Sequence, residues 1–413
     1  NEWMTREYVT PRTASEPGLA QLWEQLLLRT DVGANDHFFE LGGHSLKAMM
    51  LVALVRERWG IKLELADLFR HPTLGEMAHL IDAKGAAASD APVSDARTKE
   101  AGKIEDVLPS EILPVPEQDD YPVTSAQWRL YTVEQFEDAK TSYNMPLMLR
   151  LTGKLDEQRL QSAYRKLIER HESLRTSFVM KGDELRQVVH PAHQLNCHIE
   201  RGIDLRHVDP KERQRLLEEY RRQFVRPFDL GHAPLIRAAL LTIREDEYEL
   251  LLDMHHIVSD GVSVGILYDD LVALYEGQTL APLSIQFKDV AVWQHEERKR
   301  PSYQAARQYW LEQFATEPPR IDILTGGRRP KQRRFVGAAC TRRLPDELNK
   351  ELNQFARKTD ATLYMVLFAA YAVLLSKYTS EEDIVIGTPI AGRDHTSMNR
   401  IVGMFVNTLP VRV

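Results

Sequence analysis

The chain is poor in cysteine and carries no excess of positive charge. Its 413 residues contain two cysteines, Cys197 and Cys340, which are too few for a disulfide framework or a cysteine metal site, so we expect a reducing compartment and no metal. The formal net charge is −7, and no basic stripe is interleaved with aromatic residues, which argues against nucleic acid as a partner. No apolar run approaches the roughly 20 residues that span a membrane. Together these absences predict a cytoplasmic protein with neither a membrane nor a nucleic-acid partner.

The sequence also begins without an initiator methionine or an apolar signal core. Its first residues, NEWMTREYV, indicate a segment of a longer polypeptide. The length exceeds that of one ordinary domain, and 43% apolar with 27% charged residues is typical of globular protein. We therefore expect two or three domains, and the sequence contains no internal repeat.

Residues 1–83 have the apolar periodicity of a small helical domain. Apolar residues spaced by three and four between Leu19 and Leu27 predict a first helix. A second helix is predicted from Ser45 to Trp59, and a short helical turn and a last helix follow it. The pattern predicts a small all-α four-helix bundle with one long loop before the second helix.

Residues 84–116 differ in composition from the segments on either side. They are rich in Ala, Ser, Asp, Pro and Lys and almost free of aromatic residues, as is typical of a flexible linker. A coil of this length has an end-to-end distance of roughly 30 Å, which would let the first domain reach several partners. Apolar residues return near Ile112 to Pro116, where we expect the linker to pack on the domain that follows.

From residue 117 onward, strand-like and helical segments alternate, which predicts an α/β or α+β domain. The segment ELLLDMHH is apolar on both faces, so we expect a buried strand that ends at His255 and His256. A buried histidine needs hydrogen-bond partners, and we interpret His255 as such a structural residue. His256 lies at the strand's end beside a turn, where catalytic groups are often held by a rigid scaffold, so we interpret it as functional.

The next residues of this segment, Asp260 and Gly261, have more than one possible role. Asp260 could complete an Asp–His relay or anchor the loop by pairing with an arginine, and we favour the arginine. Gly261 would allow a close approach of backbone to substrate and could offer its N–H to a developing oxyanion.

Ser45 follows Gly42, Gly43 and His44 and begins a predicted helix. A serine at this position is also a common helix N-cap. The two glycines, however, allow a tight turn that leaves the hydroxyl exposed, and a phosphodiester there would lie at a helix N-terminus that favours anions. The string FFELGGHSL resembles the phosphopantetheine attachment site of peptidyl carrier proteins from non-ribosomal peptide synthetases. The resemblance implies that a phosphopantetheinyl transferase modifies Ser45, which then bears an aminoacyl or peptidyl thioester.

The string HHIVSDG resembles the HHxxxDG signature of condensation domains, which have a chloramphenicol acetyltransferase-like fold. Four further segments resemble motifs of the same family in the expected order: Ser125 to Tyr131, Arg170 to Phe178, Phe287 to Trp293 and Ile401 to Thr408. The resemblance implies an α/β domain of two lobes, residues 117–300 and 301–413. Because the sequence stops at Val413, it also implies that the second lobe is incomplete.

The resemblance further implies peptide-bond formation, in which an acceptor α-amine attacks a donor thioester. His256 would act as a base or a positioning group, with His255, Asp260 and Gly261 in the same motif. Arg393 in GTPIAGRDH is the candidate partner of Asp260 by analogy with the family, and Arg175 and Asn407 would give structural support. The implied partners are an adenylation domain and a downstream carrier domain.

Two alternatives remain at this point. An epimerisation domain also uses HHxxxDG, although His44 and the Phe-Val-Asn-Thr motif argue against it. A non-catalytic condensation-like recruitment module is the other alternative, and the intact His256, Asp260 and Gly261 argue against that.

Overall fold

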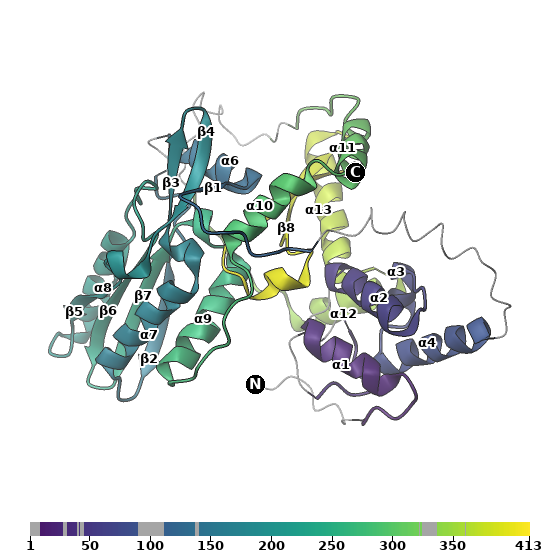
Figure 1. Cartoon of the computed structure of the whole chain (residues 1–413), viewed down its shortest axis with the longest axis horizontal. Coiled ribbons are helices and arrows are strands. Elements are labelled where there is room, and N and C mark those ends of the chain that lie inside the picture. The colour runs from purple at the N-terminus through teal and green to yellow at the C-terminus, as the bar shows by residue number, and fades with distance from the viewer. Residues whose placement is uncertain are drawn as a thin grey trace. The chain divides into compact units, whose positions relative to one another are not determined.

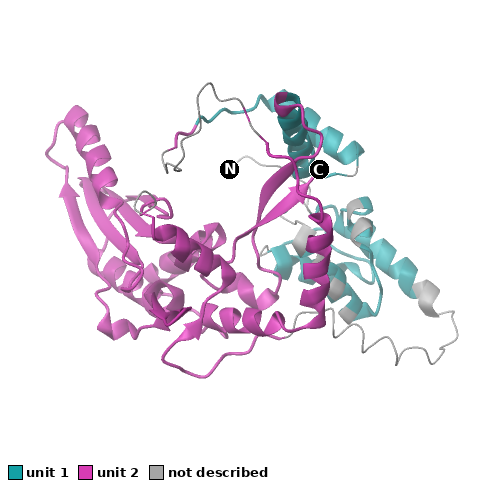
Figure 2. Ribbon diagram, turned by 90° about the horizontal axis from the view of Figure 1, so that it is seen from above, with its two compact units in different colours: residues 1–100, 340–377 teal, residues 101–339, 378–413 magenta. Residues whose placement is uncertain are grey.

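The computed structural model describes residues 9–27, 31–38, 41, 45–89, 111–136, 140–321, 323, 337–359 and 361–413. The chain divides into two compact units (Figure 2). The first contains residues 1–100 and 340–377, and the second contains residues 101–339 and 378–413.

The first unit contains a small helical bundle, as predicted. Its core is formed by apolar residues of the helices and of the loop before α2, and Trp23 meets Phe38 edge to face with 5.0 Å between ring centroids. The predicted buried face of the first helix, between Leu19 and Leu27, is confirmed. The elements are α1 (Glu16–Leu27), α2 (Ser45–Trp59), α3 (Leu65–Arg70) and α4 (Leu74–Ser89) (Figure 1).

The last helix of the bundle is longer than predicted. The sequence placed the start of the linker at residue 84, but α4 continues to Ser89. Alanine is the strongest helix former, and residues 86–88 are all alanine, so a composition that suggested a flexible tether extends the helix instead. Residues 90–110 of the predicted linker lie outside the described residues.

Two further helices, α12 (Asp346–Lys358) and α13 (Leu363–Thr379), follow later in the chain. Both expose large apolar side chains, among them Phe355, Tyr364 and Tyr371. Within the described residues no single helix is long and apolar enough to cross a membrane, and α12 and α13 reach that length and composition only as a pair bent by 102°.

The second unit is built on a four-stranded sheet of order β2-β7-β6-β5. The β2–β7 and β7–β6 pairs are antiparallel, and the β6–β5 pair is parallel. One apolar core joins the sheet to α7 and α9, and another joins its opposite face to α8 (Figure 1). The elements are β2 (Leu147–Thr152), α7 (Glu157–Arg170), β5 (Ile199–Asp204), α8 (Pro210–Phe224), β6 (Ile236–Arg244), β7 (Glu247–Met254) and α9 (Gly261–Tyr275).

Strand β7 has the two apolar faces that its sequence predicts. Leu250 and Leu252 pack with α7 and α9, whereas Leu251 packs with α8. Because both faces are covered, β7 is a rigid central strand, and it leads directly into the two histidines.

A third apolar core contains residues of α6, β3, β4, η4, α10 and η5. A three-stranded sheet has the order β1-β4-β3, and β8 pairs with β9 as an antiparallel hairpin. The elements are β1 (Tyr121–Pro122), α6 (Ser125–Glu134), η2 (Glu172–Arg175), β3 (Thr176–Lys181), β4 (Glu184–Val189), η3 (Ala192–Gln194), η4 (His256–Val258), α10 (Phe287–Glu297), α11 (Pro301–Gln313), β8 (Val385–Ile390), η5 (Thr396–Arg400) and β9 (Asn407–Arg412).

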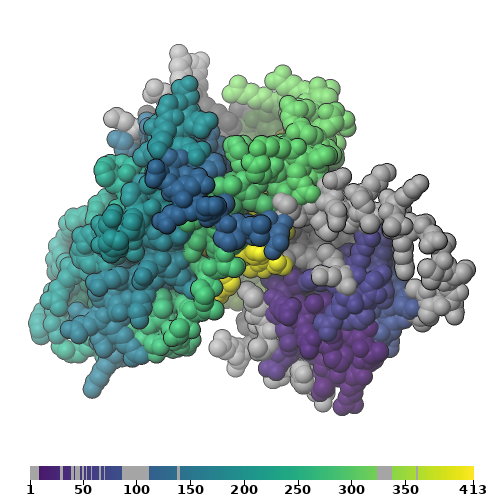
Figure 3. All heavy atoms as spheres, viewed as in Figure 1, coloured from purple at the N-terminus to yellow at the C-terminus, as the bar shows by residue number. Residues whose placement is uncertain are grey.

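Residues 111–122 pack against α10. Figure 3 shows this part of the chain in blue beside the green atoms of that helix. Ile112 is 4% exposed and belongs to the third core, and the N–H of Val115 donates to Asp289 Oδ1 at 2.9 Å. The prediction that apolar residues near 112–116 pack on the domain after the linker is therefore confirmed.

The lobe boundary at residue 300 stays a prediction. Residues 340–377 fall in the first unit, whereas β8, η5 and β9 fall in the second. Ion pairs explain the second assignment. The buried Arg393 contacts Asp260, which precedes α9, and the partly exposed Arg400 contacts Asp270 within α9.

Candidate active site

His256 begins the short turn η4, directly after strand β7 and His255. Its backbone N–H donates to the carbonyl of Tyr143 at 2.8 Å, and the half-buried ring has Nδ1 2.7 Å from the carbonyl of Ser259. A carbonyl oxygen can only accept a hydrogen bond, so Nδ1 carries the proton. In the neutral ring Nε2 is then unprotonated and able to accept a proton.

His255 has the opposite arrangement and is fully enclosed. Its Nδ1 accepts the N–H of Ile257 at 3.1 Å, so the neutral ring carries its proton on Nε2, which donates to Glu134 Oε2 at 3.4 Å. The rings of Phe228 and Tyr143 lie beside it at 6.2 and 6.5 Å between centroids. A buried structural histidine needs a hydrogen bond at each ring nitrogen, and His255 has both.

Asp260 is the N-cap of α9 and is fully buried. Its Oδ1 accepts from the N–H and hydroxyl of Ser263 at 2.8 and 2.7 Å and from Arg393 Nη2 at 3.1 Å. Its Oδ2 accepts the N–H of Phe405 at 3.1 Å. The arginine pair that we favoured is present, and the Asp–His relay is absent from the described contacts, because His256 Nδ1 faces the Ser259 carbonyl instead.

Arg393 joins this cluster to residues near the end of the chain. It donates through Nη1 to the carbonyls of Met398 and Ile401 at 2.6 and 2.7 Å, and its guanidinium lies 3.9 Å from the ring centre of Phe405. Burial lowers the pKa of Arg393 against the opposing effect of Asp260. The arginine therefore holds the loop before β9 against the N-terminus of α9.

Ser263 is a residue that the sequence analysis missed. Its hydroxyl lies between Asp260 and the backbone of Gly403, whose N–H it accepts at 3.1 Å. Gly403 itself has no room for a side chain, since a Cβ there would lie 2.0 Å from Cδ2 of Phe287. The sequence did indicate part of this role locally, because a serine three residues after an Asp N-cap is well placed to form a hydrogen bond with that aspartate.

Gly261 is the exposed first residue of α9. A Cβ built on it would meet no described atom within 4 Å, so crowding by the chain does not explain the glycine. Its N–H is one of the donors that a helix N-terminus leaves unsatisfied, which suits a developing negative charge. The oxyanion role stays a prediction.

The two other predicted support residues, Arg175 and Asn407, contact elements other than η4. Arg175 donates to the carbonyl of His190 at 2.6 Å and contacts Glu172 at 3.4 Å. Asn407 begins β9 and accepts from Arg129 Nη2 at 2.8 Å. Both bridge separate elements, and neither has a described contact with His256.

Ser45 is the first residue of α2, as predicted. Residues 42–44 lie outside the described part of the chain, and so does the side chain of Ser45. A helix N-terminus suits a phosphate ester, so the position fits a phosphopantetheine group. The attachment itself stays a prediction.

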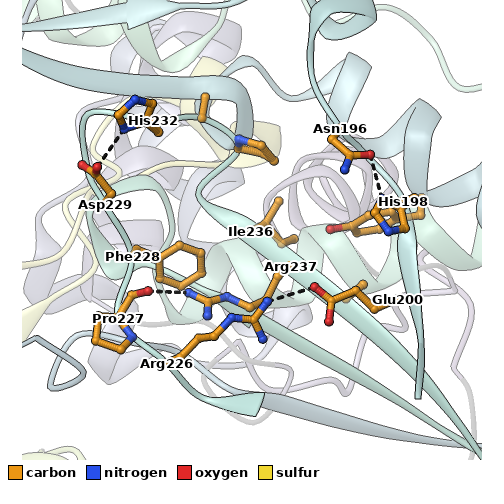
Figure 4. Close-up of a pocket in the computed structure, with 14 residues that line it drawn as sticks. Asn196, His198, Glu200, Arg226, Pro227, Phe228, Asp229, His232, Ile236 and Arg237 are labelled. Atoms are coloured by element: carbon orange, nitrogen blue, oxygen red, sulfur yellow. Dashed lines mark hydrogen bonds and ion pairs between the residues drawn. The ribbon is translucent and has the colours of Figure 1, made fainter. Parts of the chain in front are cut away.

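A cavity of about 330 Å³ opens at the starts of β5 and β6 (Figure 4). Arg237 lies 3.6 Å over the ring of Phe228 in its wall, and Arg226 pairs with Glu200 at 2.9 Å. Phe228 also contacts His255, and Asp253 pairs in register with Arg237, so this wall stands between the cavity and the end of β7. The cavity lining includes neither His256 nor Asp260.

Asp253 helps to hold the end of β7. It accepts from Asn144 Nδ2 at 2.7 Å, and burial raises its pKa in spite of that bond. Asn144 also donates to the carbonyl of Arg226 at 3.0 Å.

The described residues contain no group of three or more His, Cys, Asp or Glu placed to bind a metal ion.

Relatives of the chain are long synthetases. It is 41% identical over 407 residues to surfactin synthase subunit 1 of Bacillus subtilis (strain 168), covering 98% of this chain and 10% of that protein. It is 43% identical over 410 residues to tyrocidine synthase 3 of Brevibacillus parabrevis, covering 99% and 6% respectively. The chain thus spans a tenth or less of these relatives.

Solved structures with the same fold include the first condensation domain of the calcium-dependent antibiotic synthetase in complex with a substrate analogue. That match has 26% identity and a TM-score of 0.57 and covers 71% of this chain and 69% of the other. The X-domain from teicoplanin biosynthesis, in complex with OxyB, matches with 26% identity and a TM-score of 0.64 over 73% and 67%.

The sequence profiles of two families divide the chain. The profile of the phosphopantetheine attachment site matches residues 17–81. The profile of the condensation domain matches residues 117–413 and contains β7, the two histidines and α9. The chain therefore belongs to the condensation domain family and carries a phosphopantetheine attachment domain before its condensation domain.

Proposed function

We propose that this chain works within a longer non-ribosomal peptide synthetase, where it carries an acyl group on Ser45 and forms a peptide bond at His256. The names of its relatives, surfactin and tyrocidine synthases, support the class of product. The single observation that carries the proposal is the tautomer of His256, whose Nδ1 is bonded to the Ser259 carbonyl while Nε2 can accept a proton.

The proposed reaction joins two thioester-bound substrates. When bound, phosphopantetheine supplies the thiol that holds the acyl group as a thioester. His256 Nε2 accepts a hydrogen bond from the acceptor α-amine as that amine forms a C–N bond with the thioester carbonyl. The C–S bond breaks, and the proton that leaves the amine ends on the departing sulfur. The N–H of Gly261 is the candidate donor to the oxyanion that forms in between.

The partner of His256 limits how it can act. A backbone carbonyl supplies a partial negative charge, whereas the carboxylate of an Asp–His relay supplies a full one. The carbonyl of Ser259 therefore orients the ring but stabilises an imidazolium less. This geometry favours a residue that positions the amine and passes its proton on, with much of the rate coming from holding both substrates together.

The proposal implies three kinds of partner. A phosphopantetheinyl transferase would modify Ser45, and an adenylation domain would load the resulting thiol. The carrier of this chain would then supply the donor to the condensation domain, and a downstream carrier would supply the acceptor amine.

Intact mass tests the attachment. Incubation of the chain with coenzyme A and a phosphopantetheinyl transferase should add one phosphopantetheine, because the Ser45 hydroxyl displaces adenosine 3′,5′-bisphosphate. Ser45→Ala should abolish the mass gain. A gain that persists in Ser45→Ala would disprove the assignment.

Release of dipeptide thioester tests the condensation step. In the full synthetase with both carriers loaded, the parent protein should form dipeptide and His256→Ala should lose most of that activity. Recruitment of a partner enzyme is the second candidate function, since the X-domain that is bound to OxyB matches with a TM-score of 0.64, against 0.57 for the condensation domain. Loaded carriers that give no dipeptide, together with stable binding of a partner enzyme, would support recruitment as the function.

A further inference from the structure

Glu134 is a buried carboxylate at the end of α6 that the proposed reaction does not use. The residue is 8% exposed, and the described hydrogen-bond partner of its carboxylate is His255 Nε2 at 3.4 Å. Its Oε1 has no hydrogen-bond partner among the described residues. Burial of a carboxylate with one weak contact is costly, so the position calls for an explanation beyond packing.

Helix α6 faces the turn η4 with two buried polar side chains. Gln127 Nε2 donates to the carbonyl of Ile257 at 3.4 Å, and Glu134 contacts His255. The two are seven residues apart, which is close to two helical turns, so they lie on the same face of α6. This face therefore touches both the first and the third residue of the His255-His256-Ile257 segment.

The protonation of His255 decides whether the turn is capped. The N–H of Ile257 can only donate, so it bonds to His255 Nδ1 only while that nitrogen is unprotonated. A proton on Nδ1 would remove the bond and place two donors against each other. Glu134 accepts from Nε2–H and so favours the tautomer that leaves Nδ1 able to cap η4.

We propose that Glu134 is a positioning residue for His256, which acts by holding His255 in its Nε2–H tautomer. The adjacent histidines then have opposite tautomers for opposite tasks. His255 accepts at Nδ1 to shape the turn, and His256 donates at Nδ1 so that Nε2 stays unprotonated. The effect on rate rests on the proposed function, whereas the effect on the tautomer does not.

Nitrogen NMR of the full chain with ¹⁵N-labelled histidine tests the tautomer directly, because protonated and unprotonated ring nitrogens have well-separated shifts. Loss of signal in His255→Asn assigns the His255 resonances. The parent should show His255 with Nε2 protonated and Nδ1 unprotonated. Glu134→Ala should shift His255 toward the other tautomer, and Glu134→Gln should retain the parent pattern, because its amide oxygen can still accept.

Glu249 on strand β7 offers a matched control, since it is also 8% exposed and pairs with Arg221 of α8. Glu249→Ala removes an equally buried carboxylate and should leave the tautomer of His255 unchanged. If Glu134→Ala leaves His255 in the Nε2–H tautomer, or if Glu249→Ala shifts it equally, the proposal is wrong.

The rate of dipeptide formation in the full synthetase tests whether Glu134 positions His256. Glu134→Ala should lower kcat by about tenfold with little change in KM, the order of effect that removal of a hydrogen-bond partner has on a metal-bound histidine. Glu134→Gln should recover most of the rate. A shifted tautomer with an unchanged kcat would show that Glu134 does not position His256. A parent protein without activity would sink the proposed function instead, and the NMR result would still decide the tautomer.

Discussion

Helix α9 is held by two buried carboxylates, and the two are satisfied in different ways. Asp260, before its first residue, accepts from the backbone N–H groups of Ser263 and Phe405 as well as from side chains. Asp270, toward its end, has only side chains as its described partners, with Arg170 Nε at 2.8 Å, His171 Nε2 at 3.0 Å and Arg400 also in contact. One carboxylate is part of the backbone architecture, and the other is the centre of an ionisable cluster.

The two clusters should therefore respond to different perturbations. The backbone donors around Asp260 keep their place only while the loop at 403–405 keeps its path. Around Asp270 burial raises the carboxyl pKa, but the bonds from His171 and Arg170 outweigh it, so the pKa lies below its usual value. Burial lowers the pKa of His171 and outweighs the attraction of Asp270. The first cluster should be sensitive to geometry, and the second to pH.

The largest loss of stability is expected from Asp260→Ala. It leaves Arg393, which is 5% exposed, as a buried charge without its carboxylate, and such losses cost about 3–5 kcal/mol. Urea unfolding measures the loss. In Asp260→Ala/Arg393→Leu the combined cost should be less than the sum of the two single costs, because the unpaired charge is gone. An Asp260→Ala variant that kept its melting temperature but lost all activity would overturn the structural role.

Gly403→Ala tests the backbone side of the same cluster and should cost about 1–3 kcal/mol. The added Cβ would lie 2.0 Å from Phe287 Cδ2, so the loop or the ring must move. Gly265→Ala is the control in α9, since a Cβ there meets no described atom and alanine favours a helix by roughly 0.5–1 kcal/mol. Equal unfolding midpoints for the two variants would show that the loop tolerates the side chain.

The cluster at Asp270 should show itself in the pH dependence of stability. Below the ordinary histidine pKa of about 6.5, the unfolded chain binds a proton at His171 that the folded protein resists. The contribution of this residue is therefore present above that pH and is lost as the pH falls, by up to about 1.4 kcal/mol per pH unit. Urea unfolding at pH 7.5 and 5.5 should show a smaller pH effect for His171→Gln than for the parent, and equal effects would contradict the assignment.

The smallest loss of stability is expected from His256→Ala, at about 1 kcal/mol or less. The ring is half-buried, and its described side-chain bond is a single contact to the Ser259 carbonyl. Dipeptide formation in the synthetase should nevertheless fall by roughly 10²–10⁴-fold, the usual contribution of a general acid–base group. A melting curve beside the activity assay separates this residue from Asp260, whose substitution should affect both.

Local patterns predicted more of the fold than of the site. Spacing of three and four residues located the buried face of α1, and apolar residues on both faces identified β7 as a central strand. The same approach failed at α4, because composition alone does not separate an alanine-rich helix end from a tether. The pair of Asp260 with Arg393 came from the family motif, and the structure contains it at 3.1 Å.

Glu134 and Ser263 were not predicted, and their contacts explain why. Glu134 meets His255 across 121 residues of sequence, and Ser263 meets Gly403 across 140. No short motif contains both partners, so their roles depend on how α6 and the loop at 403 pack against the turn and α9.

The sequence by itself determined the order of domains, the candidate residues Ser45 and His256 and the buried strand that leads to the histidines, because periodicity and short motifs are properties of neighbouring residues. Only the tertiary structure decided which atoms those residues face. It gave His256 a carbonyl partner in place of Asp260, and it assigned opposite tautomers to His255 and His256. The physical reason is that a tautomer is set by the donors and acceptors around a ring, and at His255 one of them is brought by a distant element, α6.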